Sequence, residues 1–394
     1  MARIGIYGGS FNPPHLGHVL AAKEFCQKLN LDKLLVIPAA EPPHKQLSAN
    51  SPTSHDRLLM SRLAFGEIPQ AEISDMELMR TGPSYTADTL GQLKGEYSDD
   101  ELFLLMGTDM FFSFEKWYHP EEITKLATVV VAHRSEDNRE KLLAHRERLT
   151  ALFGGEILFV ENEFLPYSST ATRAMLAFGF GEDYLPVGVH EYILSNHLYL
   201  TGNDLRNLPF EILSEISLSL HKSKRVPHIV GCSETAAELA RRFGADPVAA
   251  GRAGILHDIT KALGAEEQLK LCDKCDILVD NFQRSTPKLL HAKSGAAIAE
   301  RVFGESPEVC EAIFWHTTGR KNMSVLEKII YLADYIEPNR DFDGVEELRR
   351  LAYEDLDAAM IYGLEMTISY VSSRGGIIDR NSAQALRFFK ERMQ

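Results

Sequence analysis

The sequence predicts two domains: a parallel α/β domain over residues 1–203 and an all-α domain over residues 204–394. In the first half, short apolar runs alternate with helical stretches, which is typical of a parallel sheet with helices on both faces. This strand pattern stops near residue 200, where TGNDLRNLP over residues 201–209 has the composition of a linker. A chain of 394 residues is long enough to bury two separate cores.

Five apolar runs are the predicted strands of the first domain, over residues 2–7, 33–37, 102–106, 128–132 and 157–161. A helix over residues 19–30 is expected to follow the first strand. Ligands of parallel sheets bind beyond the carboxyl ends of the strands. The segment directly after residue 7 is therefore the first place to look for a site.

The second half shows helical segments without strand-like runs and without an internal repeat. The predicted helices cover residues 210–220, 233–243, 247–256, 292–302, 307–316, 324–335, 345–366 and 383–392. These segments predict an all-α second domain.

Composition excludes several classes of protein. The apolar fraction of 44% and the charged fraction of 25% are those of a globular protein. A net charge of −14 argues against non-specific nucleic-acid binding, which needs a basic surface. The absence of an apolar run of about 18 residues predicts no membrane span. No secretory signal is visible at the N-terminus, so we expect a cytoplasmic protein.

The cysteine content fits the same compartment. Five cysteines, an odd number, favour reduced thiols. Cys272 and Cys275 form a CxxC pair, but there is no second pair and no nearby pair of histidines. A structural zinc or redox role for them is therefore disfavoured.

The segment GGSFNPPHLGH over residues 8–18 has the features of a phosphate site. Gly8 and Gly9 allow the backbone to approach a ligand closely. His15 and His18 are three residues apart at a helix start, so they share one face. Helix-start N–H groups attract anions, and two imidazoles beside them can stabilise charge that develops during phosphoryl-type transfer.

This segment resembles the phosphate-binding motif of the HxGH nucleotidyltransferases, which have a Rossmann-like fold. A second segment, YSSTATR over residues 167–173, resembles their ISSTxxR signature. Ser168, Ser169 and Thr170 can cap a helix, and Arg173 lies one turn further along. The two segments together predict two anion sites at helix starts.

Four other segments resemble the nicotinate-nucleotide adenylyltransferase family, over roughly the first 200 residues. They are PPHK (42–45), PSYTADTL (83–90), GTDMFFSFEKW (107–117) and LPVGVHEYILSNHLY (185–199). The resemblance implies that ATP and nicotinate mononucleotide, with Mg²⁺, give nicotinate adenine dinucleotide and pyrophosphate. An alternative acceptor, pantetheine phosphate or a cytidylyl acceptor, stays open, although these segments speak against it.

The resemblance also implies site residues. ATP and its phosphates are expected at Gly8, Gly9, Ser10, Phe11, His15, His18, Lys45, Ser169, Thr170 and Arg173. Among these, His15, His18 and Arg173 are the catalytic candidates. Nicotinate mononucleotide is expected at Thr86, Asp109 and Trp117.

Histidines and aspartates in the second half predict a metal centre. In GILHDITK, His257 and Asp258 are adjacent near the end of an apolar helix, where both are costly unless paired or bound to metal. Single candidate ligands come from successive helices: His228, His257, Asp258, His291, His316 and Asp334. Imidazole and carboxylate suit Fe, Mn, Zn or Ni. Six ligands exceed one tetrahedral site and indicate two metals.

The order H…HD…D resembles the HD-domain phosphohydrolases. The segments AGILHDITK, HAKSGA, WHTTG and LADYIEPNR are similar to bacterial HD hydrolases that cut diadenosine tetraphosphate symmetrically to two ADP. This resemblance implies a di-iron centre bridged by a catalytic Asp258, and phosphate contacts from Lys261 and Arg340.

Two interpretations of the second half remain open. The leading one is a second enzyme on the same chain. The alternative is a regulatory nucleotide-binding module without turnover. In either case the expected partners are small nucleotides rather than nucleic acid or membrane, and a homo-oligomer is compatible with the sequence.

Overall fold

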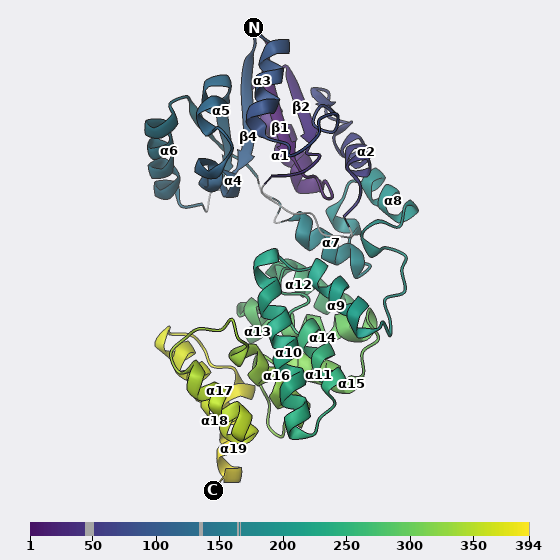
Figure 1. The fold of residues 1–394 in the computed structure, drawn as a ribbon, viewed down its shortest axis with the longest axis vertical. Coiled ribbons are helices and arrows are strands. Elements are labelled where there is room, and N and C mark those ends of the chain that lie inside the picture. The colour runs from purple at the N-terminus through teal and green to yellow at the C-terminus, as the bar shows by residue number, and fades with distance from the viewer. Residues whose placement is uncertain (44–50, 134–136, 164, 166, 394) are drawn as a thin grey trace. The chain divides into compact units, whose positions relative to one another are not determined.

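The computed structural model describes residues 1–43, 51–133, 137–163, 165 and 167–393 (Figure 1). The chain divides into two compact units, Met1–Gly202 and Asn203–Gln394. Among the described residues, none of the helices combines the length and the apolar character needed to cross a lipid bilayer.

A six-stranded sheet forms the centre of the first unit, with the strand order β3-β2-β1-β4-β5-β6. Its strands are β1 (Arg3–Gly9), β2 (Lys33–Pro38), β3 (Ala71–Ile73), β4 (Glu101–Gly107), β5 (Thr128–His133) and β6 (Ile157–Glu161). Every neighbouring pair is parallel. All carboxyl ends therefore meet at one edge of the sheet, and the strand order reverses between β1 and β4, where ligands of such sheets bind.

Helices cover the sheet, and β1, β2 and β4 lie side by side between them in Figure 1. The helices of this unit are α1 (Leu16–Lys28), α2 (Ser54–Phe65), α3 (Thr86–Glu96), α4 (Thr108–Ser113), α5 (Pro120–Leu126), α6 (Arg139–Phe153), α7 (Ser169–Ala177) and α8 (Val187–Ser195). Apolar strand residues such as Ile4 and Val129 pack in one buried cluster with Leu93 of α3, Ile123 of α5 and Leu149 of α6. The predicted Rossmann-like α/β class is confirmed.

The five predicted strands are all present, and one strand was not predicted. β3 is three residues long, lies at the sheet edge and exposes Glu72 in its middle. A strand this short has no alternating apolar pattern that a sequence can reveal.

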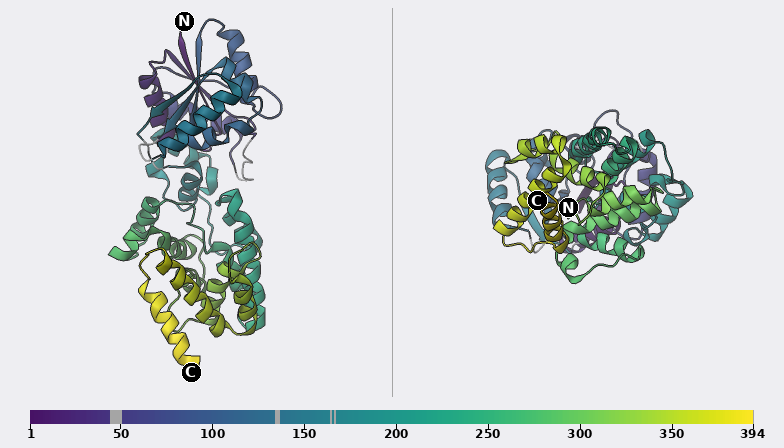
Figure 2. Two further views of the ribbon diagram at one scale, coloured as in Figure 1. Left: turned by 90° about the vertical axis from the view of Figure 1, so that its left-hand side faces the viewer. Right: turned by 90° about the horizontal axis from the view of Figure 1, so that it is seen from below.

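The second unit is helical, as predicted. Its helices are α9 (Phe210–Ser219), α10 (Val226–Phe243), α11 (Pro247–Leu256), α12 (Ala265–Lys274), α13 (Asn281–Ser285), α14 (Leu290–Arg301), α15 (Pro307–Trp315), α16 (Val325–Ile336), α17 (Val345–Glu354), α18 (Leu356–Ser373) and α19 (Arg380–Met393). α16 is a central helix, with Ile329, Ile330 and Leu332 fully buried, and it packs on α10, α15 and α18. The last two helices pack together, as the yellow helices in Figure 2 show.

The predicted single helix over residues 345–366 is wrong, because the chain breaks between α17 and α18. Asp355 has extended backbone angles, φ −151° and ψ 111°, and its side chain accepts hydrogen bonds from the N–H groups of Asp357 and Ala358. An aspartate that caps a new helix start in this way ends the preceding helix. The structure also contains α12 and α13, which the apolar pattern did not predict.

Candidate active sites

The loop after β1 carries the first group of predicted residues. A Cβ on Gly9 would lie 3.1 Å from the Phe11 ring, so a larger residue there would disturb this packing. Phe11 is 2% exposed, and its ring lies 5.3 Å from the ring of His18 between centroids. Phe11 therefore packs against His18 and also lines a cavity beside this loop.

His15 and His18 stand together at the start of α1. Their ring centroids are 3.7 Å apart, and the backbone N–H of His15 donates to Nδ1 of His18 over 3.1 Å. Because Nδ1 of His18 accepts this bond, the ring proton of a neutral His18 lies on Nε2. Burial, and then the charge of His18, hold the pKa of His15 well below 6.5. His15 is therefore neutral at pH 7.

The second predicted motif meets the first through hydrogen bonds. Ser168 caps α7 by accepting from the N–H of Ala171. Arg173 is 9% exposed and donates to the carbonyl of Asn12 over 2.7 Å, and Ser169 donates to the carbonyl of Pro13 over 3.2 Å. Two segments about 160 residues apart in sequence are thus fixed to each other at the carboxyl edge of the sheet.

Two cavities open at this edge, and His18 lines both. The larger, about 590 Å³, is lined by His15, Asp109, Ser169 and Thr170 among others. The smaller, about 460 Å³, is lined by residues of the β1 loop together with Thr86 and Trp117. His18 could therefore contact a ligand in either cavity.

The structure separates one predicted set. Thr86 and Trp117 share the smaller cavity, as expected for one ligand, but Asp109 lines the larger one. Asp109 lies in the first turn of α4, directly after β4, and it lines the same cavity as His15 and His18. Lys45 lies outside the described residues.

Arg57 of α2 was not among the predicted residues, although it organises this site. It is 1% exposed and donates to the carbonyls of Ser10, Ala39 and Ala40, over 2.8, 2.6 and 3.0 Å. It therefore joins the loop after β1 to the loop after β2. A charged residue inside the apolar face of SHDRLLM was the only signal in the sequence.

The second unit brings the six predicted metal ligands to one place, centred on Asp258. Asp258 Oδ2 lies 3.5 Å from Nε2 of His257 and 3.9 Å from Nε2 of His228. Asp258 Oδ1 lies 3.2 Å from Nε2 of His291 and 3.8 Å from Nε2 of His316. Each oxygen of one carboxylate thus faces two histidines.

Asp334 completes the half of the cluster around His228 and His257. Its Oδ1 lies 3.2 Å from Nε2 of His228 and 3.8 Å from Nε2 of His257. The potential ligand atoms of these three residues all lie within 4.8 Å of one another, and the same holds for His257, Asp258 and His316.

All four histidines are oriented through Nδ1. His257, His291 and His316 each have Nδ1 within 2.7 Å of the backbone carbonyl three residues earlier. His228 has Nδ1 3.1 Å from the carboxylate of Glu337, a buried residue that was not predicted. An imidazole held in this way presents an unprotonated Nε2, which is the arrangement of metal-bound histidines.

The buried atoms of the cluster fit a metal. Nε2 of His257 is buried and makes no hydrogen bond among the described residues. Burial lowers the pKa of His257 and lowers that of His316 to about 3, so both rings are neutral, as ligands must be. Although burial opposes ionisation, His257, His291 and Lys261 hold the pKa of Asp258 well below its usual range. Neutral imidazoles around ionised carboxylates suit a divalent transition metal.

Three basic side chains border this cluster. Lys261 Nζ lies 3.9 Å from Asp258 Oδ1, and Arg340 contacts Asp334. Arg225, which was not predicted, donates from Nε to Asp258 over 2.7 Å. These side chains are between 31% and 36% exposed, so they lie between the buried ligands and solvent.

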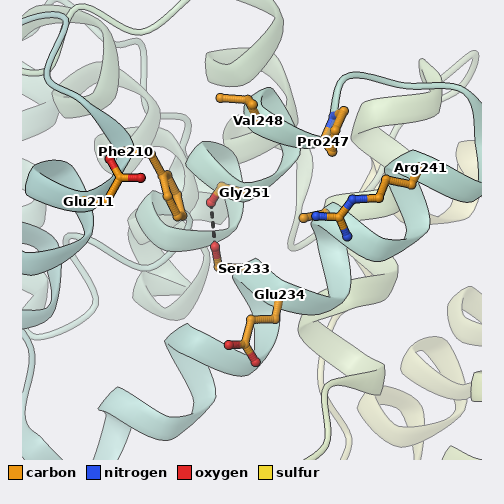
Figure 3. A pocket seen from close by; sticks show the side chains of 9 residues that line it. Phe210, Glu211, Ser233, Glu234, Arg241, Pro247, Val248 and Gly251 are labelled. Carbon is orange, nitrogen blue, oxygen red and sulfur yellow. Dashed lines mark hydrogen bonds between the residues drawn. The ribbon is translucent and has the colours of Figure 1, made fainter.

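A separate cavity of the second unit lies between α9, α10 and α11 (Figure 3). It measures about 410 Å³, and Ser233 on one wall donates to the carbonyl of Gly251. Phe210 and Val248 supply apolar surface, with Arg241 at the rim. None of the predicted site residues lines it.

Comparison with known families gives a separate match for each of the two units. A cytidylyltransferase-like family model matches residues 6–175, and an HD domain model matches residues 225–339. A Borreliella afzelii protein named probable nicotinate-nucleotide adenylyltransferase is 37% identical over 199 residues, 50% of this chain and 97% of its own length. A Pseudomonas syringae pv. tomato protein of the same name is 38% identical over 213 residues, 51% of this chain and 95% of its own length.

A solved structure resembles the other half. It is a Clostridium acetobutylicum protein described as a "predicted HD superfamily hydrolase involved in NAD metabolism". The two are 36% identical, the match covers 47% of this chain and 98% of that protein, and the TM-score is 0.46.

Proposed function

The chain belongs to the nicotinate-nucleotide adenylyltransferase family and carries a C-terminal HD domain, and from these memberships we propose that it is a bifunctional enzyme. The first unit transfers AMP from ATP to nicotinate mononucleotide. The second hydrolyses a phosphoanhydride at a metal centre.

For the first reaction, the observation that carries the proposal is the position of His18 between the two cavities. A phosphate oxygen of nicotinate mononucleotide in the smaller cavity attacks the α-phosphorus of ATP in the larger one. The bond from that phosphorus to the β-phosphate oxygen breaks, and pyrophosphate leaves. His18 donates from Nε2 to the phosphate oxygens as charge develops on them, and Mg²⁺ accompanies ATP.

The surrounding residues fix this geometry. Arg173 holds the β1 loop through Asn12, and Ser169 holds it through Pro13. The N–H groups at the start of α7 and the hydroxyl of Thr170 would bind oxygens of the triphosphate. Thr86 and Trp117 line the cavity proposed for the nicotinate nucleotide.

The test is pyrophosphate release by the intact protein with ATP and a panel of acceptors. Nicotinate mononucleotide is expected to react fastest, ahead of nicotinamide mononucleotide and pantetheine phosphate. Faster reaction with pantetheine phosphate, or with CTP in place of ATP, would overturn the assignment.

For the second reaction, the carrying observation is that the two oxygens of Asp258 face different pairs of histidines. Asp258, together with the four histidines and Asp334, would hold two metal ions, which we propose to be iron. Bound there, the metals would activate water for attack on phosphorus. Lys261, Arg340 and Arg225 would hold the phosphate chain of the substrate, which we propose to be diadenosine tetraphosphate, giving two ADP.

This proposal is tested by metal analysis and product chromatography on the intact protein. We expect close to two metal ions per chain and conversion of diadenosine tetraphosphate to ADP in the presence of Fe²⁺ or Mn²⁺. Metal binding without conversion of any dinucleoside polyphosphate would favour a regulatory module instead.

A further inference from the structure

Asn162 follows β6 directly and carries an unsatisfied buried amide. The side chain is 8% exposed, and among the described residues neither its Oδ1 nor its Nδ2 has a hydrogen-bond partner. Its backbone is fixed, because its N–H donates to the carbonyl of His133 at the end of β5 over 3.0 Å. Leaving both polar atoms of a buried amide unpaired costs free energy, which a matching ligand would recover.

Asn162 is one of the residues that line the larger cavity of the first unit, the one of about 590 Å³. His15, His18 and Thr170 line the same cavity, and so does Asp109. In the proposed function this cavity receives ATP. Its polar groups occur in a definite order along the sheet edge: the imidazoles follow β1, Asp109 follows β4 and Asn162 follows β6.

That order matches the order of groups in a nucleotide. Phosphates suit the imidazoles and the start of α7, and an acidic residue such as Asp109 after a strand suits ribose hydroxyls. The base would then lie at the end of β5 and β6. Both hydrogen-bonding edges of adenine place the amino donor N6 beside a ring-nitrogen acceptor, N1 or N7, and an asparagine amide complements either edge with two hydrogen bonds.

We propose that Asn162 recognises the purine base of the triphosphate: its Oδ1 accepts from N6 of adenine, and its Nδ2 donates to the neighbouring ring nitrogen. This inference rests on the proposed function of the first unit. It adds a residue that determines which base is accepted.

The test compares ATP with purine riboside triphosphate, which lacks the 6-amino group. In the natural protein, kcat/KM with ATP is expected to exceed that with the analogue by about tenfold or more, the value of one hydrogen bond. In Asn162→Leu this ratio falls to about one, because the amino group has lost its acceptor. KM for nicotinate mononucleotide stays unchanged.

A second variant separates this role from a structural one. Asn162→Asp keeps an acceptor for the amino group but loses the donor to the ring nitrogen. The ratio between the two nucleotides is therefore kept, while both kcat/KM values fall by about tenfold or more. If the leucine variant keeps the natural ratio, the proposal is overturned. If the leucine variant does not fold, natural kcat/KM values in the aspartate variant overturn it.

The role of Asn162 in binding the base can be tested even if nicotinate mononucleotide is not the acceptor. If the natural protein releases no pyrophosphate with nicotinate mononucleotide, the proposed function fails. Calorimetric binding of ATP and of the analogue to the natural protein and both variants then gives the same comparison. If Asn162→Leu weakens the binding of ATP and of the analogue equally, the proposal that Asn162 recognises the 6-amino group is overturned.

Discussion

Nδ1 of His228 lies 3.1 Å from Oε1 of Glu337, and both side chains are buried. The other oxygen of Glu337 accepts from the backbone N–H and the side-chain amide of Asn339, over 2.7 and 2.8 Å. The remaining three histidines of the cluster face backbone carbonyls instead. Among the four histidines of the cluster, His228 is thus the one whose Nδ1 faces a carboxylate within the described part of the chain.

Replacing this partner is expected to weaken metal binding. A carboxylate that accepts from Nδ1 fixes the ring and makes Nε2 a better donor to metal, so Glu337→Ala should lower metal affinity about 10- to 100-fold. Glu337→Gln keeps an acceptor and should lose less. Competition with a chromophoric chelator measures the affinity.

The matched control is Glu347→Gln, which changes an exposed glutamate of α17. It should bind metal as the natural protein does. If folded Glu337→Ala also keeps the natural affinity, Glu337 does not orient His228 toward a metal.

Asp258→Ala is expected to remove metal and hydrolysis together. All four histidines lie within 3.9 Å of its two oxygens, so the variant loses the group common to both halves of the cluster. Elemental analysis should find little metal, while pyrophosphate release by the first unit stays within about twofold, because local changes in separate units act independently. Asp343→Ala, an exposed position, serves as the control. Retained metal with retained cleavage would remove Asp258 from the centre.

Local pattern accounts for most of what the sequence predicts correctly. Runs such as KLLVI and TVVVA are long enough to indicate strands, and their ends place the sites at one edge. β3 escapes the pattern because it is only three residues long and lies at the sheet edge. The break at Asp355 escapes it because one capping side chain produces the break. The strand depends on its pairing with β2, and the break depends on one local side chain; apolar periodicity records neither.

The site residues also differ in whether local sequence pattern reveals them. Histidines and glycines in tight motifs are recognisable one segment at a time. Arg57 and Glu337 act through contacts with segments up to 47 and 109 residues away. The sequence marks Arg57 only as a charge within the apolar face of a helix and gives no sign for Glu337, so only the folded chain reveals their partners.

Arg57→Ala is expected to destabilise the first unit. The guanidinium is buried and donates to three backbone carbonyls, and its removal takes this donor from each of them. Hydrogen bonds from a charged group contribute about 1.5–3 kcal/mol each, so a loss of about 3 kcal/mol or more in unfolding free energy is expected. Urea unfolding measures it. Arg62→Ala, at an exposed position of the same helix, should change stability by less than about 0.5 kcal/mol. Equal stabilities of the two variants would contradict this role.

His18→Ala is expected to slow adenylyl transfer without unfolding the protein. His18 lines both cavities, so its loss removes a donor at the point where the two substrates are proposed to meet. Removal of one such donor costs about 2.7–4 kcal/mol, or about 100- to 1,000-fold in kcat. Pyrophosphate release at saturating substrates is the measurement. The exposed His55 provides the control variant His55→Ala, and near-natural turnover in His18→Ala would refute the assignment.

The CxxC pair at the end of α12 is expected to resist alkylation in the folded protein. Cys272 and Cys275 are 1% and 5% exposed, and burial raises the pKa of Cys275 and raises that of Cys272 from 9.0 to about 11. Only the thiolate reacts, and at pH 8 a thiol with this pKa is ionised in about one molecule in a thousand.

Because the folded state favours the neutral thiol, the contribution of Cys272 to stability is complete below pH 9 and is lost as pH rises through about 11. Light iodoacetamide on the folded protein at pH 8, followed by heavy iodoacetamide after unfolding, should label both cysteines heavy in the mass spectrum. Cys272→Ser identifies the peptide. Rapid reaction of Cys272 with the light reagent in the folded protein would contradict this expectation. It would show an accessible thiolate, which a metal or redox role for the cysteine pair requires.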